Sequence, residues 1–314
     1  MTGTTTAAPP TRLMVWGALV IVYIVWGSTY LAIRITVEDM PPLLTGGVRF
    51  VVAGLIVAAV MAVRYGPSVL RIPPLELRGV AIVGALLVAG GNGGVMLGEQ
   101  TVPSGIAALL VAMVPLWVVL LRGASGDRPR GLTWAGVLLG FLGLVVLVAP
   151  GGAGGGDAAG IALVVGAATC WSIGSFASQR MAMPSNPFVA TAWEMAIGGL
   201  VQIVVGLLLG ERAAAIGSYS TESLLAFGYL IVFGSLVAFT AYVWLLQHAR
   251  LSFVATYAYV NPIVAVVLGA LILSEPVTVP ILVGGAIVVV GVALVVSAER
   301  PSSAPSETPD PQPE

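Results

Sequence analysis

The chain has 314 residues, of which 58% are hydrophobic and only 9% are charged, and its formal net charge is −1. About a quarter of the residues of a soluble domain are charged, so this composition excludes a soluble domain and predicts a membrane protein. The arginines form no extended basic patch, so nothing indicates nucleic-acid binding.

Ten apolar runs follow one another along the chain, and each has close to the about 20 residues that cross a bilayer as a helix. They cover residues 13–33, 43–63, 79–98, 104–121, 131–149, 160–179, 188–209, 224–246, 253–273 and 277–297. The alternating polarity of barrel strands is absent. We therefore expect an all-α membrane protein with ten transmembrane helices. Its 40 glycines are expected to mark close helix contacts, as at Gly136 and Gly140 and at the Gly198–Gly199 pair.

The orientation of the helices follows from arginine alone, because the chain contains no lysine. With a cytoplasmic N-terminus, the inner segments hold ten arginines, the outer segments hold only Arg34 and Arg212, and Arg49 lies within a span. This bias obeys the positive-inside rule. It predicts that both termini are cytoplasmic, as an even number of helices requires.

The two halves of the chain repeat one another. Trp26 is echoed by Trp171 after 145 residues, and Pro115 by Pro262 after 147 residues. Each half holds five apolar runs, and an odd number of spans places the second copy in the membrane in the opposite orientation. Inverted repeats of this kind are the architecture of secondary transporters, with a substrate site between the repeats.

We expect a cytoplasmic tail (1–12), a first five-helix repeat (13–149), a Gly-rich periplasmic linker (150–158), a second five-helix repeat (159–298) and a disordered cytoplasmic tail (299–314). The loops are short, and without lysine a Walker ATP-binding loop is impossible. The energy for transport is therefore expected from an ion gradient or from the substrate's own gradient.

Trp26, Tyr30, Trp171 and Ser175 form a set at equivalent positions of the two halves. Tryptophan usually marks the membrane interface, but these residues lie eight or nine residues from the arginines at the helix ends, which is deep for an interfacial belt. We expect them to line a cavity.

Arg49 and Glu194 are the charged residues that lie deepest in the spans. Each falls six residues into its run, about 9 Å deep at 1.5 Å per residue, and the two positions are equivalent in the repeats. A charge at this depth costs about 2–3 kcal/mol unless it faces protein or water. Both are candidates for the substrate pathway. The alternative is a structural ion pair, or a hydrogen bond to a broken helix end.

Glu194 is also the candidate for coupling to protons, because it is the one acid well inside a span and burial favours its neutral form. Arg49 would then hold a substrate carboxylate or keep cations from leaking.

The segment Gly90-Gly-Asn-Gly-Gly94 interrupts the third run. Five residues of poor helix propensity have two interpretations: close helix packing, or an unwound segment whose backbone and Asn92 amide face a polar cavity. At the end of this run Glu99 either lines an external vestibule or meets solvent and headgroups. For Glu275, which precedes Pro276, we expect capping of the next helix.

Pro115 and Pro262 lie at matching mid-span positions, where each removes one backbone hydrogen bond and kinks its helix. Paired kinks suit hinge bending during alternating access, and a static kink is equally compatible. Tyr257 and Asn261 share a helix face just before Pro262. An aromatic face with one amide suits amphipathic small molecules, and hydrogen bonding between helices is the alternative.

Several motifs resemble the EamA family of the drug/metabolite transporter superfamily. They are Trp26-Gly-Ser-Thr-Tyr-Leu-Ala-Ile-Arg34, Gly47-Val-Arg-Phe50, Gly91-Asn-Gly93, Val102-Pro-Ser-Gly-Ile-Ala107 and Tyr257-Ala-Tyr-Val-Asn-Pro-Ile-Val-Ala-Val-Val-Leu-Gly269. The resemblance covers residues 13–298 and implies two inverted five-helix repeats in a bacterial inner membrane, exporting small metabolites or drugs. One departure is that the Gly-Glu pair that often ends the ninth helix reads Ser274-Glu275 here, and Arg128 stands at the matching position of the first half.

We therefore expect an inner-membrane exporter of amino acids, their analogues or drugs that works by alternating access with proton antiport. An uncoupled facilitator or channel is the alternative, and the two differ in whether transport changes the pH inside vesicles. One His, one Cys and no Asp within a span argue against an enzyme. We expect no cofactor and no metal, a small-molecule substrate, contact with the bilayer and with protons, and a monomer or a homodimer.

The orientation is testable with reporter fusions after Asp157 and Arg300. The arginine bias predicts that the first reporter is periplasmic and the second cytoplasmic, as measured by alkaline phosphatase and fluorescent-protein activity. The same compartment for both fusions would contradict the inverted repeat.

Overall fold

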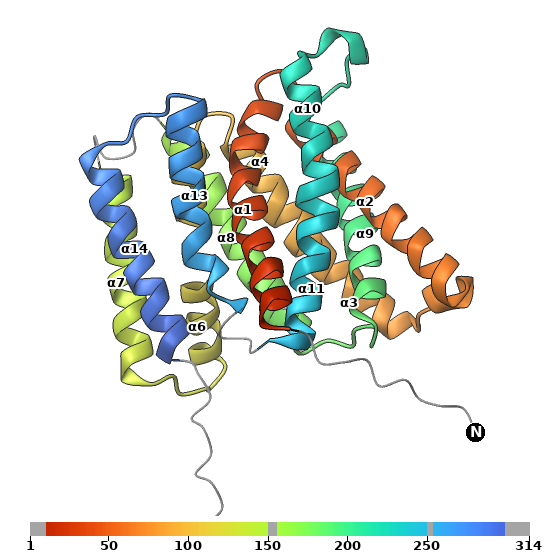
Figure 1. Cartoon of the computed structure of the whole chain (residues 1–314), viewed down its shortest axis with the longest axis horizontal. Coiled ribbons are helices and arrows are strands. Elements are labelled where there is room, and N and C mark those ends of the chain that lie inside the picture. Colours follow the sequence, from red (N-terminus) through yellow and green to blue (C-terminus); the bar gives the residue numbers. More distant parts are fainter. Residues whose placement is uncertain (1–10, 150–155, 250–253, 299–314) are drawn as a thin grey trace, which may run out of the picture.

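The computed structural model describes residues 11–149, 156–249 and 254–298, and every regular element within them is a helix (Figure 1). The elements are α1 (Arg12–Thr36), α2 (Pro42–Tyr65), η1 (Pro67–Leu70), α3 (Pro74–Gly84), η2 (Ala85–Asn92), α4 (Gly93–Gly98), α5 (Ser104–Val111), α6 (Val114–Ala124), α7 (Gly131–Val148), α8 (Ala158–Ser178), α9 (Pro187–Leu208), η3 (Ile216–Ser218), α10 (Thr221–Tyr229), η4 (Leu230–Val237), α11 (Ala238–His248), α13 (Tyr257–Ile272) and α14 (Val279–Ala298). Most of both predicted tails and of the Gly-rich linker lies outside the described residues.

Nine helical stretches of the described chain are long and apolar enough to cross a membrane, and α13, with 16 residues, is a shorter apolar helix. Three of the nine combine consecutive elements, namely α3–η2–α4, α5–α6 and α10–η4–α11. The all-α prediction is confirmed for the described residues. The ten predicted runs match these ten stretches, although α13 falls below the length that defines the other nine.

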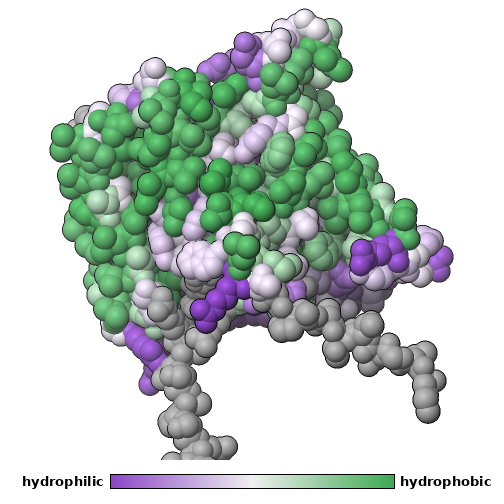
Figure 2. Space-filling model, in the orientation of Figure 1, coloured by the Kyte–Doolittle hydropathy of each residue, from purple (hydrophilic) through white to green (hydrophobic). Residues whose placement is uncertain are grey.

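The outer surface of the bundle is apolar. Leu138, Leu208 and Leu271 are among many large hydrophobic side chains that are more than two-thirds exposed. Figure 2 shows hydrophobic side chains over most of one face, with hydrophilic ones gathered toward both ends of the helices. Water would not tolerate so large an apolar surface on a monomer, whereas lipid tails solvate it. The protein is therefore a membrane protein.

The helices define two ends of the bundle (Figure 1). α1 begins at Arg12 and α14 ends at Ala298 on the same side, which we call the terminal end, and the Nη1 atom of Arg130 donates to the main-chain oxygen of Ala298 there (3.5 Å). At the opposite side, which we call the distal end, α1 ends at Thr36 and α5 begins at Ser104.

Two helix pairs, α2 with α9 and α7 with α14, pack along their length, and we call these contacts the two helix seams. A Cβ atom on Gly199 of α9 would lie 2.7 Å from the main-chain oxygen of Gly47 on α2. A Cβ atom on Gly143 of α7 would lie 2.8 Å from the oxygen of Gly284 on α14. Only glycine permits such backbone approach, so the prediction that glycines mark helix contacts is confirmed.

The glycine-rich segment of the third run remains helical. Residues Ala85–Asn92 form a π-helical segment, η2, and Gly90, Gly91 and Gly94 face side chains of α8. The interpretation of these glycines as sites of close helix packing is therefore confirmed, and the interpretation as an unwound segment was wrong. A second π-helical segment of eight residues, η4, begins 145 residues after η2, and neither was predicted. π-Helical turns are rare and occur mostly at functional sites.

The two prolines have different surroundings. The fourth predicted helix breaks at Ala112 and Met113 into α5 and α6, and Pro115 lies in the first turn of α6, where its missing N–H costs nothing. Pro262 lies within α13, which continues through it. The kink predicted at Pro115 is thus found just before it, as a two-residue interruption at Ala112 and Met113 within one apolar stretch.

Two carboxylates cap helices at the distal end. α2 and α5 lack a side-chain cap of their own. Glu211 accepts from the main-chain N–H groups of Leu43 (3.1 Å) and Leu44 (2.8 Å) at the start of α2. Glu275 accepts from the N–H of Ser104 (2.8 Å), its hydroxyl (3.0 Å) and the N–H of Gly105 (3.2 Å) at the start of α5. The predicted capping by Glu275 of the next helix was wrong, because Glu275 caps α5.

Substitution at a helix seam has a predictable cost. In Gly199→Leu, the new Cβ atom would meet backbone atoms of α2, so the helices must separate, and overpacking of this kind typically costs about 1–3 kcal/mol. We expect a lower midpoint of thermal unfolding in detergent. Gly166→Leu on α8, where no atom lies within 4 Å, is the matched control and should leave the midpoint unchanged. Equal midpoints for both variants would show that the seam does not limit stability.

Candidate functional site

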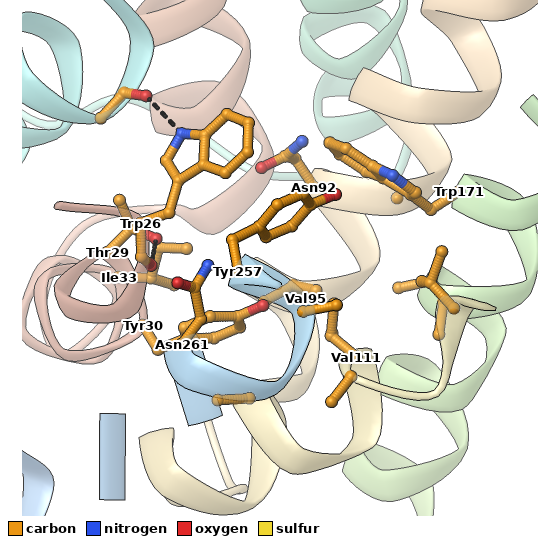
Figure 3. Close-up of a pocket in the computed structure, with 18 of the residues that line it drawn as sticks. Trp26, Thr29, Tyr30, Ile33, Asn92, Val95, Val111, Trp171, Tyr257 and Asn261 are labelled. Atoms are coloured by element: carbon orange, nitrogen blue, oxygen red, sulfur yellow. Dashed lines mark hydrogen bonds between the residues drawn. The ribbon is translucent and has the colours of Figure 1, made fainter. Parts of the chain in front are cut away.

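A cavity of about 180 Å³ lies between the helices. Side chains from both halves of the chain surround it, and most of its wall is apolar. The lining residues are Trp26, Thr29, Tyr30, Ile33, Arg49, Phe50, Gly91, Asn92, Val95, Ala108, Val111, Ala112, Val114, Pro115, Ala167, Ala168, Trp171, Met195, Gly234, Ser235, Phe239, Tyr257, Ala258, Asn261 and Pro262. Figure 3 shows Trp26, Asn92, Trp171 and Tyr257 around the same space.

One wall of the cavity is an aromatic cluster. The ring of Trp26 lies 5.0 Å from that of Tyr242 and 5.2 Å from that of Tyr257, and the two tyrosine rings are 5.7 Å apart. The Nε1 atom of Trp26 donates to the main-chain oxygen of Gly234 in η4 (3.2 Å; Figure 3). Edge-to-face packing of this kind fixes the rings, so the wall is preformed.

Arg49 is the one charged side chain among the lining residues. It is 4% exposed, its Nε atom donates to the hydroxyl of Ser235 (2.8 Å), and its guanidinium lies 4.6 Å from the centre of the Phe50 ring. Its Nη1 atom is buried without a hydrogen-bond partner among the described residues. Burying a charged N–H donor without a hydrogen-bond acceptor costs free energy. A bound anion that accepts from Nη1 would remove this cost, so Nη1 is a candidate anion contact.

η4 supplies both polar anchors of this wall. Gly234 accepts from Trp26, and Ser235 accepts from Arg49, so one π-helical turn holds the aromatic cluster and the guanidinium. Asn92, the last residue of η2, donates to the oxygen of Leu87 (3.3 Å). The irregular turns therefore carry polar groups that face the cavity.

Asn261 connects two helices at the cavity wall. With its amide nitrogen directed at carbonyl oxygens, it donates to the main-chain oxygens of Tyr23 on α1 (3.2 Å) and Tyr257 on α13 (3.3 Å). The hydrogen bonding between helices considered as an alternative for Asn261 is therefore present, and the same residue lines the cavity.

The structure brings together nine of the residues singled out from the sequence and leaves three outside the cavity. The nine that line it are Trp26, Tyr30, Arg49, Asn92, Pro115, Trp171, Tyr257, Asn261 and Pro262. Ser175 and Glu194 are partly exposed elsewhere, although Met195 beside Glu194 does line the cavity. Glu99 is fully buried at the distal end, so the expectation that it meets solvent was wrong.

Arg49 and Glu194 do not form an ion pair with each other; the ion pair among the described residues joins Arg122 and Asp127 (2.5 Å). The structural ion pair considered for Arg49 and Glu194 is therefore absent. Arg49 instead donates to the hydroxyl of Ser235 inside η4, which continues directly into α11, so the hydrogen bond to a broken helix end is not found either.

Thr29, Ser235, Phe239 and Tyr242 were missed by sequence reasoning. A signal existed for Ser235, because it lies 145 residues after Gly90, inside the glycine-rich segment that was singled out. Applying the repeat offset to that segment would have led to η4. Phe239 carries the same signal, because it lies 145 residues after Gly94 of that segment, whereas Thr29 and Tyr242 do not.

An all-helical bundle with a lipid-compatible surface around a mostly apolar cavity defines a membrane protein that handles a small solute. The sequence profile of the EamA-like transporter family matches residues 14–149 and 158–297, and the chain therefore belongs to this family. The family and the relatives below are named as transporters, which indicates a transporter.

Three relatives illustrate the family. The chain is 40% identical over 259 residues to the uncharacterized inner membrane transporter YedA of Escherichia coli, covering 82% of both chains. It is 26% identical to the uncharacterized transporter YvbV of Bacillus subtilis, covering 91% of this chain and 92% of that one. It is 27% identical to a probable amino-acid metabolite efflux pump of E. coli, covering 82% and 86%.

A solved crystal structure shares the fold, with a TM-score of 0.61 at 22% identity over 92% of this chain and 98% of that one. This similarity supports the helical arrangement and carries no information on the substrate.

Proposed function

We propose that the protein is a secondary transporter that exports a small metabolite across the inner membrane through ten spans, arranged as inverted five-helix repeats at 13–149 and 159–298. The terminal end faces the cytoplasm and the distal end faces the periplasm. Three features support the repeat. The family profile matches each half once, η2 and η4 begin 145 residues apart, and both helix seams join helices at corresponding positions of the halves.

The shorter α13 is the tenth span in this proposal. Its 16 residues reach about 24 Å at 1.5 Å per residue, somewhat less than the about 30 Å of hydrocarbon. Local thinning of the bilayer accommodates a short span at modest cost. The matching positions of Pro115 and Pro262 beside the cavity suit them as hinges between inward-open and outward-open states.

The cavity is the proposed substrate site, and we infer the chemical class of the substrate from Arg49. A guanidinium with an unpartnered Nη1 atom in an aromatic, largely apolar cavity suits a solute with one carboxylate and an apolar body. Amino acids and their analogues have this chemistry, and one relative is named as a probable amino-acid metabolite efflux pump. Cationic drugs without a carboxylate fit less well, because no acid among the lining residues would neutralise them.

The test compares L-phenylalanine with phenylethylamine, which has the same ring and amine but no carboxylate. In proteoliposomes containing the wild-type protein, phenylalanine should be the better substrate in counterflow. Because hydrogen bonds to charged groups contribute about 1.5–3 kcal/mol, Arg49→Gln should weaken phenylalanine transport about 10- to 100-fold and abolish the preference.

Arg64→Gln, in the exposed last turn of α2, is the matched control and should behave as wild type. An Arg49→Gln variant that keeps the preference for phenylalanine would refute the carboxylate site.

We further propose that export is coupled to proton entry, with Glu194 as the titrating group. Glu194 lies within a span, next to Met195 of the cavity wall, and is not paired with Arg49. A carboxyl without a fixed cation partner can bind a proton on one side and release it on the other. Substrate and proton would then bind alternately.

Glu194→Gln keeps the size of the side chain but cannot titrate. In proteoliposomes this variant should still exchange substrate but lose its response to an imposed pH gradient. Glu222→Gln, at an exposed position in the first turn of α10, is the control. Transport by Glu194→Gln that remains pH-driven would exclude Glu194 as the coupling group. If the wild type also ignored the gradient, the uncoupled facilitator would be the better description.

A further inference from the structure

Glu99 is the most unusual buried group of the described chain. It follows the last turn of α4 at the distal end, its exposed fraction is 0%, and neither carboxyl oxygen has a hydrogen-bond partner among the residues that the structure describes. A buried carboxylate that is neither paired nor hydrogen-bonded is very costly, and such groups neutralise instead. The feature therefore points to a bound ligand that removes the charge.

Among the described residues, no neighbour donates a hydrogen bond to the carboxyl group of Glu99. From α1, the Nη1 atom of Arg34 donates to the main-chain oxygen of Glu99 and not to its side chain, so Arg34 acts on the carboxyl group as a nearby positive charge without a direct bond. From the segment after α13, Glu275 interacts with Glu99 as a like charge. Two residues after Glu99, Thr101 donates to Asp157 at the start of α8 (2.7 Å), and Asp157 is not among the charges that act on Glu99.

Glu275 acts as the hydrogen-bond acceptor at the start of α5. All of its hydrogen-bond partners are donors, namely two main-chain N–H groups and the hydroxyl of Ser104, and the start of a helix favours a negative charge. Ser274 has a φ of +54°, a region that favours glycine, and the N–H of Glu275 donates to the oxygen of Gly269 (3.1 Å). The backbone thus fixes Glu275 in its capping position. A second carboxylate beside it would be repelled.

Tyr30 is a neighbour of Glu99 that also lines the cavity. It lies one helical turn before Arg34 on α1 and is close enough to Glu99 for their charges to interact. Its hydroxyl can accept and donate a proton, so Tyr30 is suited to pass a proton between the carboxyl group and the cavity.

We propose that Glu99 is a proton-binding site that must be filled before the distal end of the bundle can close. In the closed arrangement the carboxyl carries its proton and is neutral. When the distal end opens, water reaches Glu99, the proton is exchanged with water, and the resulting carboxylate can turn toward Arg34. This inference rests on the proposed alternating access and adds a proton site distinct from Glu194.

The first readout is the infrared carbonyl band of a neutral carboxylic acid in the purified full-length protein. We expect the wild type to show such a band at pH 8, where ordinary glutamates are ionised. Glu99→Gln should abolish it, whereas Glu194→Gln should keep it. Should Glu99→Gln fail to fold, Glu99→Asp serves instead and should shift the band. A wild-type spectrum without the band, or a band unaffected by changes at Glu99, would overturn the proposal.

The second readout is the midpoint of thermal unfolding between pH 5 and pH 8. The unfolded chain releases this proton near pH 4.3 whereas the folded chain keeps it, so stability should fall as pH rises, by up to about tenfold in the folding equilibrium per pH unit. Glu99→Gln should remove the part of this pH dependence that comes from one proton, so its unfolding midpoint should fall less steeply with pH than that of the wild type. An identical pH dependence in both proteins would refute the proposal.

A comparison of sodium chloride with choline chloride distinguishes a proton site from a metal-cation site. If sodium chloride raises the unfolding midpoint of the wild type and choline chloride does not, and if Glu99→Gln responds to neither salt, then Glu99 binds a metal cation. This result would also overturn the proton assignment. None of these measurements uses transport. Failure of the substrate assignment therefore leaves them interpretable, and failure here leaves the transport proposal standing.

Discussion

The arrangement of the bundle depends on the direct approach of helix backbones at the two seams. Lipid tails are as apolar as leucine, so hydrophobicity does not drive helices together within a bilayer, and close van der Waals contact has to do so. At Gly47 and Gly199, and again at Gly143 and Gly284, main-chain atoms of one helix occupy the space of a missing side chain on the other. In Figure 1 the seams lie on opposite sides of the bundle, and the helices that carry most of the cavity lie between them.

The cavity owes its polar groups to irregular helix geometry. In a regular α-helix every main-chain oxygen before the last turn is satisfied within the helix. The wider turns of η4 leave the oxygen of Gly234 available to Trp26 and direct the hydroxyl of Ser235 toward Arg49. Polar contacts are thus placed at mid-bundle without a lipid-exposed break in the backbone, which the hydrocarbon would not tolerate.

The sequence predicted the spans and the glycine contacts well, because both follow from short-range patterns. It located most of the cavity through the repeat, since Trp26 and Trp171 both line it. The same symmetry failed for Arg49 and Glu194, because equivalent positions in sequence do not have equivalent neighbours once the cavity is asymmetric.

Long-range partners were beyond prediction. The caps formed by Glu211 and Glu275 join residues about 170 positions apart, and the charges that act on Glu99 come from α1 and from the segment after α13. η2 was missed because a glycine-rich helix and an unwound chain share one composition, and η4 was missed because its apolar residues with one glycine read as an ordinary span. The length of each apolar run predicted a membrane span, but the composition of the run did not predict the helix geometry inside it.

Both carboxylate caps run in one direction, from the second half of the chain to the first. The position in the first half that corresponds to Glu275 holds Arg128, which has no acceptor to offer a helix start. Two copies of the first half would consequently assemble without this cap, even if their seams fitted. The two halves are therefore not interchangeable at the distal end, because the second half supplies the carboxylates that cap the helix starts of the first.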